Sequence, residues 1–270
     1  PRAGQQSSRL FGRGMDYAES RVYQSGDDVR RLDWRLTARS GTLHTKLFQE
    51  EREARLLVLL DTHASMRFGT RARYKSVQAA RACAVAAWLA SAAGERVGLA
   101  AFGACREVLR PRSGARGALA LCGALAAWDA QGPVDRSEAL AQALRRVRQL
   151  RQVANRVLLV SDGFSADDEA RPLLLALRRH AEVGVLVIAD ALEHDDPPAG
   201  RFMLEHAGVR REATLAGDRQ RRAFRACMAA GSQRLQALAA ACGVRCRVLD
   251  TRGDPLDAVV AVLGVTRSRG

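Results

Sequence analysis

The sequence predicts an α/β fold, a doubly wound and mostly parallel sheet that follows an amino-terminal extension with short strands. Three observations predict this fold. From Arg55 onward, apolar runs of strand length alternate with helical patterns, which places helices on both faces of one sheet. The runs are apolar at successive positions, as in strands that are buried on both faces. Residues 1–54, by contrast, are polar and poor in helical periodicity.

Each element of the α/β domain follows from its own pattern. Strands are expected at 55–61, 96–102, 155–162, 182–190 and 244–250. Helices are expected at about 71–93, 115–129, 137–152, 168–181, 217–241 and 254–264. The chain has 270 residues, of which 47% are hydrophobic, so it can enclose one large core. We assign residues 55–265 to that domain.

The extension, residues 1–54, is expected to pack on the α/β domain. In the stretch 41–51, apolar and polar residues alternate as they do in a strand or hairpin arm. The stretch 23–41 has the highest density of charged residues. Trp34 lies in this charged stretch and is expected to be buried. Its aspartates are expected to pair within the extension, whereas its arginines could pair with them or receive acidic groups of a partner. The aspartates are Asp27, Asp28 and Asp33, and the arginines are Arg30, Arg35 and Arg39.

The net charge of +14, from 43 basic and 29 acidic residues, favours an acidic partner, a nucleic acid or an anionic membrane surface. Aromatic residues make up only 5% of the chain, which is too few for base-stacking platforms, and no nucleic-acid-binding motif is present. In the run 145–151, helical spacing turns Val147 and Leu150 inward and the arginines outward, as on a solvated face. Nucleic-acid or anionic-surface binding is therefore the alternative function.

The six cysteines are scattered, and only Cys242 and Cys246 lie close together, so no zinc knuckle is formed. Free cysteines in alanine-rich helices are typical of a reducing compartment. The longest weakly polar run, 82–93, is too short to span a bilayer, and no signal-peptide pattern opens the chain. We therefore expect a cytoplasmic protein without a transmembrane segment.

Two expected strands end on aspartate in a polar loop, Asp61 in "LLDTHAS" and Asp162 in "LVSDGFS". Ligands of open α/β sheets bind at the carboxyl ends of the strands. Two carboxylates at that edge, with Ser65 nearby, offer the oxygen ligands that Mg²⁺ or Mn²⁺ prefers. Alternatively, each aspartate caps the helix that follows it. The sequence leaves both interpretations open.

The stretch "GRGMDYAESRVYQSGDDVRRLDWRLTAR", followed by "LLDTHASM", resembles the bacterial family known as domain of unknown function fifty-eight. The resemblance extends over essentially the whole chain and implies a von Willebrand factor A-like domain. It also implies a MoxR-type AAA+ ATPase as partner, in a chaperone-like system for the assembly or maturation of client proteins. The identity of the client is not encoded in any motif of the sequence.

The resemblance further implies a metal-ion-dependent adhesion site with the pattern Asp-x-Ser-x-Ser. Asp61 and Ser65 match its first and third named positions, and Asp162 matches the aspartate of a later loop. His63 stands where the middle serine is expected. Histidine supplies a nitrogen ligand, which suits Zn²⁺ better than Mg²⁺ or Mn²⁺.

A second position of that pattern also departs from it. The loop that carries a threonine in the family corresponds to 132–140, where Val134 takes the threonine's place. Asp135 and Ser137 are adjacent, but neither aligns with it. Because valine cannot ligate a metal, we expect divalent-cation binding to be weak, altered or lost, with zinc the less favoured ion.

The sequence does not favour an enzyme. Asp61, His63 and Ser65 are too close along one loop for the usual triad geometry, and no nucleophile elbow or P-loop is present. A second polar stretch, 193–206, offers a metal cluster, although prolines and acidic residues favour a solvated loop. Its candidate ligands are Glu193, His194, Asp195, Asp196 and His206. A metal-dependent hydrolase remains the minor alternative.

The leading hypothesis is a non-enzymatic interaction module, an adaptor or co-chaperone of a MoxR-type AAA+ ATPase. Loops at the carboxyl edge of a sheet are presented on a rigid scaffold, so we expect the partner to bind there. The expected partner-binding residues at this edge are Asp61, His63, Ser65, Asp135 and Asp162, together with Arg30, Arg35 and Arg39 of the extension.

Overall fold

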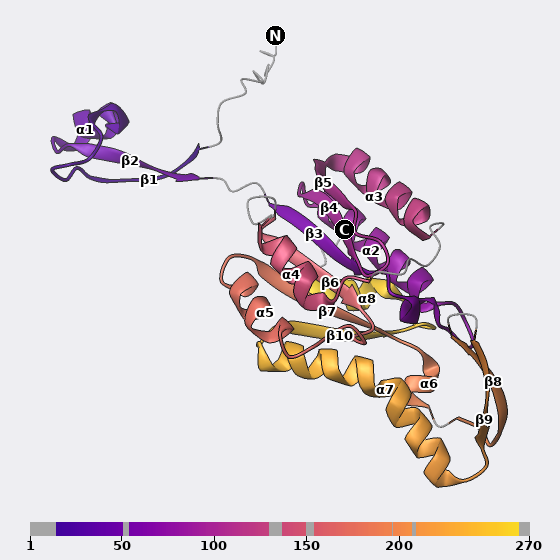
Figure 1. Cartoon of the computed structure of the whole chain (residues 1–270). Coiled ribbons are helices and arrows are strands. Elements are labelled where there is room, and N and C mark those ends of the chain that lie inside the picture. Colours follow the sequence, from indigo (N-terminus) through magenta and orange to yellow (C-terminus); the bar gives the residue numbers. More distant parts are fainter. Residues whose placement is uncertain are drawn as a thin grey trace. The chain divides into compact units, whose positions relative to one another are not determined.

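The computed structural model describes residues 15–50, 54–129, 137–149, 154–195, 197–206 and 209–264. The chain divides into two compact units, Pro1–Glu53 and Ala54–Gly270. Each unit is described by itself, and its elements are labelled in Figure 1. The packing of the first unit on the second stays a prediction.

The second unit is built around a six-stranded sheet in the order β10-β7-β6-β3-β4-β5. Its strands are β3 (Arg55–Asp61), β4 (Arg96–Phe102), β5 (Val108–Ser113), β6 (Arg156–Ser161), β7 (Glu182–Ala189) and β10 (Arg245–Asp250). All neighbouring pairs are parallel except β4 and β5. The prediction of a mostly parallel α/β fold is confirmed. The strand order reverses between β3 and β6, which is where open sheets of this type form their binding crevice.

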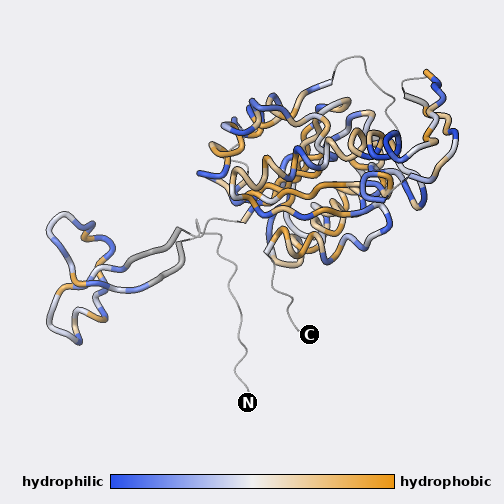
Figure 2. The backbone as a smooth tube through the Cα atoms, turned by 90° about the horizontal axis from the view of Figure 1, so that it is seen from below, coloured by the Kyte–Doolittle hydropathy of each residue, from blue (hydrophilic) through white to orange (hydrophobic). Residues whose placement is uncertain are grey.

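Three helices cover each face of the sheet (Figure 1). One layer consists of α2 (Lys75–Ala92), α3 (Gly114–Asp129) and α8 (Pro255–Leu263), and the other of α4 (Leu140–Gln149), α5 (Ala170–Arg178) and α7 (Asp218–Ala241). Side chains alternate along β3, so Leu56 and Val58 join one apolar core and Leu57 and Leu59 the other. Figure 2 shows the apolar strands enclosed between helices with hydrophilic outer faces.

The first unit is a hairpin of β1 (Met15–Val22) and β2 (His44–Glu50), joined through the turn η1 (Val29–Arg31) and α1 (Trp34–Ser40). The strand expected within 41–51 is confirmed as β2. Asp33 accepts a hydrogen bond from the Leu36 N–H at 3.1 Å and so caps α1. Trp34 is 66% exposed, so the residues of its own unit do not bury it.

One edge strand and one hairpin lack the pattern on which the sequence prediction depends. The edge strand β5 carries Pro111, and four of its six residues are exposed, so it has no apolar run. The hairpin of β8 (Gly200–His206) and β9 (Val209–Leu215) is similarly polar. Strands of this kind expose most of their side chains and do not give the signature of a buried strand.

Gly163, directly after the site aspartate Asp162, adopts a φ of +84°, which favours glycine. A Cβ built there would collide with the backbone oxygen of Gly231 in α7 and approach Leu235 to 2.7 Å. We expect Gly163→Ala to lower the free energy of unfolding by about 1–3 kcal/mol. Alanine disfavours the positive φ, and its Cβ would push the loop away from α7. Chemical denaturation measures the change. Gly123→Ala, with nothing within 4 Å, is the control, and equal effects would contradict the argument.

Candidate functional site

Asp61 ends β3 and is only 2% exposed. Its Oδ1 accepts a hydrogen bond from the backbone N–H of His63 at 2.9 Å and lies 2.6 Å from the ring Nδ1 of His63. Its Oδ2 accepts hydrogen bonds from the hydroxyls of Ser161 at 2.6 Å and Ser165 at 3.2 Å. Both carboxylate oxygens are therefore bound by protein donors.

The His63 ring is held in place from two sides. It packs edge-on against Phe102 with a centroid separation of 5.8 Å. A Cβ at Gly103 would come within 2.7 Å of its Nδ1, so the ring fits because that position is glycine. Burial lowers the pKa of His63, but the hydrogen bond and charge of Asp61, with the charges of Asp162 and Glu138, outweigh burial and raise the pKa above 6.5.

The raised pKa of His63 can be measured by an NMR titration of the chain's five histidines. We expect His63 to titrate above 6.5 and its pKa to fall in Asp61→Asn, because the ionic partner is then lost. The stabilisation from the charged ring is fully present below the unfolded pKa and is lost as the pH rises through the folded pKa. The other four histidines are internal controls. A His63 pKa that Asp61→Asn leaves unchanged would contradict the assignment.

Asp162, which follows β6, is fully buried and binds a buried lysine. The Nζ of Lys75, at the start of α2, lies 2.8 Å from Asp162 Oδ2 and 3.1 Å from Glu193 Oε1. The Lys75 side chain is 1% exposed, and its ammonium lies over the rings of Phe68 at 5.8 Å and Phe164 at 5.3 Å. The positive charge next to Asp162 is therefore supplied from within the chain.

The neighbouring carboxylates favour the charged form of Lys75. Burial lowers the pKa of Lys75, but the charges of Asp162 and Glu193 and their hydrogen bonds outweigh it, so the pKa is raised. At Glu193, burial outweighs the contact with Lys75, and the pKa of this carboxyl is also raised. As the pH falls, Glu193 therefore takes up a proton more readily than an ordinary glutamate does.

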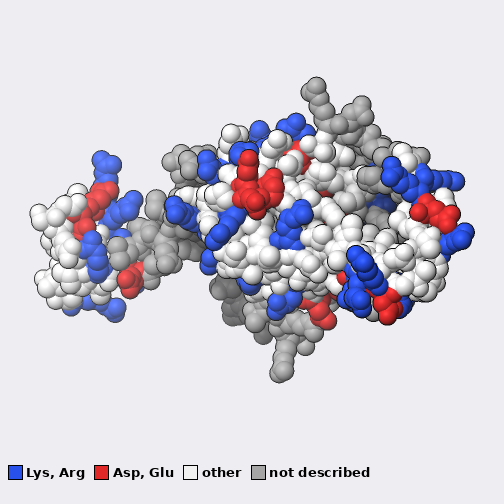
Figure 3. All heavy atoms as spheres, turned by 60° about the horizontal axis from the view of Figure 1, so that its bottom comes forward, with Lys and Arg blue, Asp and Glu red and all other residues white. Residues whose placement is uncertain are grey.

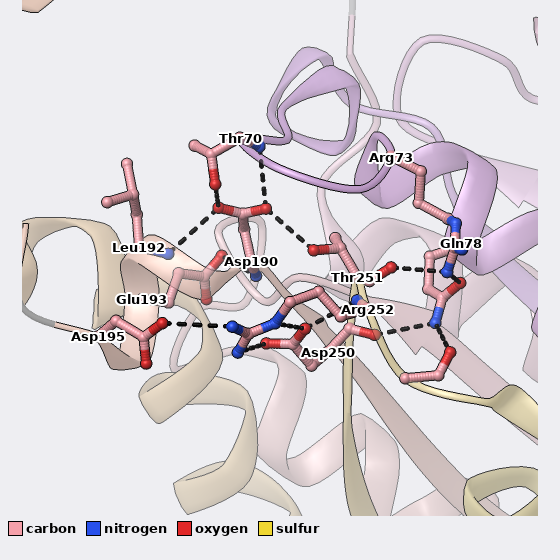
Figure 4. Close-up of polar contacts among 11 residues, drawn as sticks. Thr70, Arg73, Gln78, Asp190, Leu192, Glu193, Asp195, Asp250, Thr251 and Arg252 are labelled. Atoms are coloured by element: carbon pink, nitrogen blue, oxygen red, sulfur yellow. Dashed lines mark hydrogen bonds and ion pairs between the residues drawn. The ribbon is translucent and has the colours of Figure 1, made fainter.

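A third aspartate, Asp190, follows the strand β7, caps the short helix α6 (Ala191–His194) and is fully buried. Figure 4 shows how three segments converge on it. Thr70 donates from its hydroxyl at 2.5 Å and from its N–H at 3.1 Å, the Leu192 N–H donates at 3.2 Å, and the Thr251 hydroxyl donates at 3.0 Å. Burial raises the pKa of Asp190, but these hydrogen bonds outweigh it and lower the pKa.

The remaining buried carboxylate at this edge, within the described ranges, is Glu138, next to Ser137. It accepts two hydrogen bonds from Arg146 of α4, at 2.8 and 3.1 Å. Arg146 also donates to the Ala101 carbonyl at 2.6 Å, so this arginine of the run 145–151 reaches inward, contrary to the expectation of a solvated face. Val147 is buried as expected, whereas Leu150 lies outside the described residues.

Other residues predicted for the site either lie outside the described residues or make contacts that differ from those expected. Val134 and Asp135 lie outside the described residues. The Ser65 hydroxyl is buried and has no hydrogen-bond partner in the part of the chain that the structure describes, so it does not join Asp61 and His63 in a triad. Asp61 and Asp162 hold the loops after their strands through the N–H groups of His63 and Phe164, rather than capping helices.

The interpretation of 193–206 as a solvated loop is wrong at Glu193, which is buried against Lys75, and at β8, which is a strand. His194 is exposed, and Asp195 lies 3.4 Å from Arg252. Asp196 lies outside the described residues, as does the side chain of His206. Within the described ranges, no group of three or more histidine, cysteine, aspartate or glutamate side chains is arranged to hold a metal ion.

The aspartates of the first unit bond internally, but not with the arginines expected from the sequence. Asp27 pairs with Arg21 at 2.7 Å, Asp28 accepts from the backbone N–H of Arg30, and Asp33 accepts from Ser20 at 2.9 Å. Side-chain pairing with Arg30, Arg35 and Arg39, one of the two interpretations left open for these arginines, is not among the contacts that the described aspartates make. Those three arginines are exposed.

Lys75 is the principal functional residue that the sequence prediction missed. Two of the 43 basic residues are lysines, and Lys75 is one of them. Arginine presents a wide planar fork, whereas lysine is a compact charge on a flexible stem that fits a narrow buried site. A lone lysine at the start of a helix, in a chain that otherwise uses arginine, was the available signal.

The sequence profile of the family described as Protein of unknown function DUF58 matches residues 19–237. The chain belongs to this family. Uncharacterized protein Rv1480 of Mycobacterium tuberculosis is 32% identical to it over 207 residues, which are 76% of the chain and 65% of that protein. The chain thus spans slightly less than two thirds of the length of this relative. DUF58 membership confirms the resemblance stated from the sequence.

One solved structure supports the fold of this DUF58 chain, and a second matches more weakly. The conserved hypothetical protein BatB from Bacteroides thetaiotaomicron matches with a TM-score of 0.50 and 13% identity, over 78% of the chain and 97% of BatB. A von Willebrand factor type A structure from Catenulispora acidiphila matches with a TM-score of 0.40 and 16% identity, over 55% of the chain and 36% of that structure. No helix within the described residues is both long and apolar enough to cross a membrane.

Proposed function

We propose that this DUF58 chain is a non-enzymatic protein-interaction module, an adaptor or co-chaperone that works with a MoxR-type AAA+ ATPase in the assembly or maturation of client proteins. The partner-facing part is the carboxyl edge of the sheet, with the loops that carry Asp61, His63, Ser65 and Asp162; Asp135, also expected to bind the partner, lies outside the described residues. We also propose that this edge works without a bound divalent cation.

One observation carries the proposal: the buried carboxylates at this edge are already bound by the chain itself. Asp61 binds His63 and two serine hydroxyls, and Asp162 binds Lys75. A divalent cation would have to displace an ammonium that is buried between two carboxylates. The donor set therefore does not fit the metal that the adhesion-site pattern implies, and it offers no activated nucleophile among the described residues.

Isothermal titration calorimetry with divalent cations tests whether this edge of the sheet binds a metal ion. We expect no tight binding of Mg²⁺ or Mn²⁺, because Lys75 already neutralises Asp162, and at most weak binding of Zn²⁺ at His63. Tight Mg²⁺ binding that Asp61→Ala abolishes would contradict the proposal.

Co-purification from the native cells tests the partnership. We expect a MoxR-type ATPase of these cells to be retained on the immobilised protein in a nucleotide-dependent manner. Arg67→Glu, at the proposed edge, should weaken retention, whereas Arg148→Glu, which lies in α4 at a separate surface hollow, should not. An ATPase that never associates, with or without nucleotide, would contradict the partnership.

The alternative of nucleic-acid binding has less support. On the face shown in Figure 3, basic and acidic side chains are interspersed and do not form one continuous basic surface. Arg145 pairs with Glu169 at 2.6 Å, and Arg221 pairs with Asp218. Strong DNA retention that falls steeply with salt would favour this alternative over an adaptor.

A further inference from the structure

An apolar pocket of about 570 Å³ opens beside the Asp61–His63 pair. It lies between α2 and α3, which pack side by side on one face of the sheet (Figure 1). Its size falls within the range of pockets that bind small molecules and peptide side chains. Asp61 and His63 form part of its lining at one end, whereas Lys75, Asp162 and Glu193 do not line it.

The interior of the pocket is apolar. Buried side chains from three segments form it: Met66, Cys105, and Leu125 and Trp128 of α3. Small residues widen it, because Ala80 and Ala84 face it from α2 and Ala126 from α3. Trp128 donates a hydrogen bond from its Nε1 to Glu107 at 2.8 Å, which orients its ring in the wall. An apolar pocket of this kind suits a bulky hydrophobic side chain.

The rim of the pocket is positively charged. Arg67 and Arg81 line it and are exposed. Among the described residues of the lining, the only acidic one is Asp61, which is buried and bound by His63. Arg81 uses one Nη1 hydrogen bond, to Gln78 at 3.1 Å, and a guanidinium carries five N–H donors. The rim therefore complements a carboxylate.

We propose that this pocket is the docking point for an acidic peptide segment of a partner protein. A bulky apolar side chain of the segment enters the pocket, and an adjacent aspartate or glutamate pairs with Arg81 and Arg67. This inference rests on the proposed interaction function and specifies the chemistry of the partner. It requires no metal, because the carboxylate is received by arginine in a bidentate geometry.

Selection from a displayed random peptide library against the purified protein tests the inference. We expect enrichment of peptides with a leucine, isoleucine, methionine, phenylalanine or tryptophan next to an aspartate or glutamate. Enrichment should disappear with Ala84→Phe and with Ala126→Phe, which fill the pocket from two different helices. Ala223→Phe, at an exposed position of α7, is the matched control and should retain it. Thermal unfolding of each variant shows whether it is folded.

The charge requirement is tested on one enriched peptide by fluorescence anisotropy. Arg81→Glu should weaken binding about tenfold, whereas Arg148→Glu on α4 should leave it unchanged. The inference is overturned if no peptide is enriched, if enriched peptides lack acidic residues, or if the filled variants bind equally well. It is also overturned if the wild type forms a dimer that Ala84→Phe and Ala126→Phe disrupt, since the occupant is then a second copy.

The selection uses this protein alone, so its failure is distinguishable from failure of the proposed function. If the ATPase is retained but no peptide is enriched, the pocket inference fails and the partnership stands. If peptides bind in the pocket but the ATPase is never retained, the pocket stands and the partnership fails.

Discussion

Replacing Lys75 with methionine is expected to destabilise the α/β unit by about 3–5 kcal/mol, because it leaves two buried carboxylates without their cation. Asp162 and Glu193 are both fully or almost fully buried, and each lies within 3.1 Å of the ammonium. Methionine keeps the unbranched apolar stem of lysine and is one heavy atom shorter, so most of the loss reports the missing charge and only a small part the space it leaves. Denaturation followed by far-ultraviolet circular dichroism measures the change.

Two further variants make the Lys75 prediction decisive. The triple variant Lys75→Met, Asp162→Asn, Glu193→Gln removes all three charges and should recover much of the stability, because the cost of an uncompensated charge is then absent. Arg81→Met, further along the same helix but exposed, should change stability by less than about 0.5 kcal/mol. A triple variant that is no more stable than Lys75→Met would show that the charges are not the cause.

Replacing Asp190 with leucine is expected to cost more than about 3 kcal/mol, because each orphaned buried donor costs about 1–3 kcal/mol. Four donors converge on this carboxylate, from the loop before α2, from α6 and from the loop after β10 (Figure 4). Asp190→Asn keeps one acceptor oxygen and should cost less. Thr251→Val, which removes one of the four donors, should have the smallest effect.

The lowered pKa of Asp190 gives this prediction a pH dependence. Its stabilisation is present above the unfolded pKa and is lost as the pH falls through the folded pKa. Stability curves of the wild type and Asp190→Asn, measured from neutral to acidic pH, should therefore converge at low pH. A difference between them that is independent of pH would contradict the role of the ionised carboxylate.

The parts of the fold that were predictable are those whose side chains must be apolar. The five parallel strands were predicted because the sheet buries both of their faces, as the alternation of Leu56 and Leu57 between two cores shows. The edge strand β5 and the β8–β9 hairpin were missed because their side chains are largely exposed. Hydropathy therefore reports burial more directly than it reports secondary structure.

The candidate site was predictable only in part. Asp61 and Asp162 stood out because each closes an apolar run, and both lie at the carboxyl edge. Lys75 was hidden because it is 87 residues from Asp162 and 118 from Glu193 along the chain, so no local spacing joins them. Glu193 was misjudged because polar residues follow it in the sequence, whereas in space its carboxylate contacts Lys75 and the backbone N–H of Asp190.

The long sequence separation of the Lys75 contacts also bears on folding kinetics. The contact with Asp162 requires β6 to have joined β3, and the contact with Glu193 requires β7 as well. Contacts that form late in folding stabilise a protein by slowing its unfolding and leave the folding rate almost unchanged. We therefore expect Lys75 to bear on how long the folded α/β unit persists, more than on how fast it is reached.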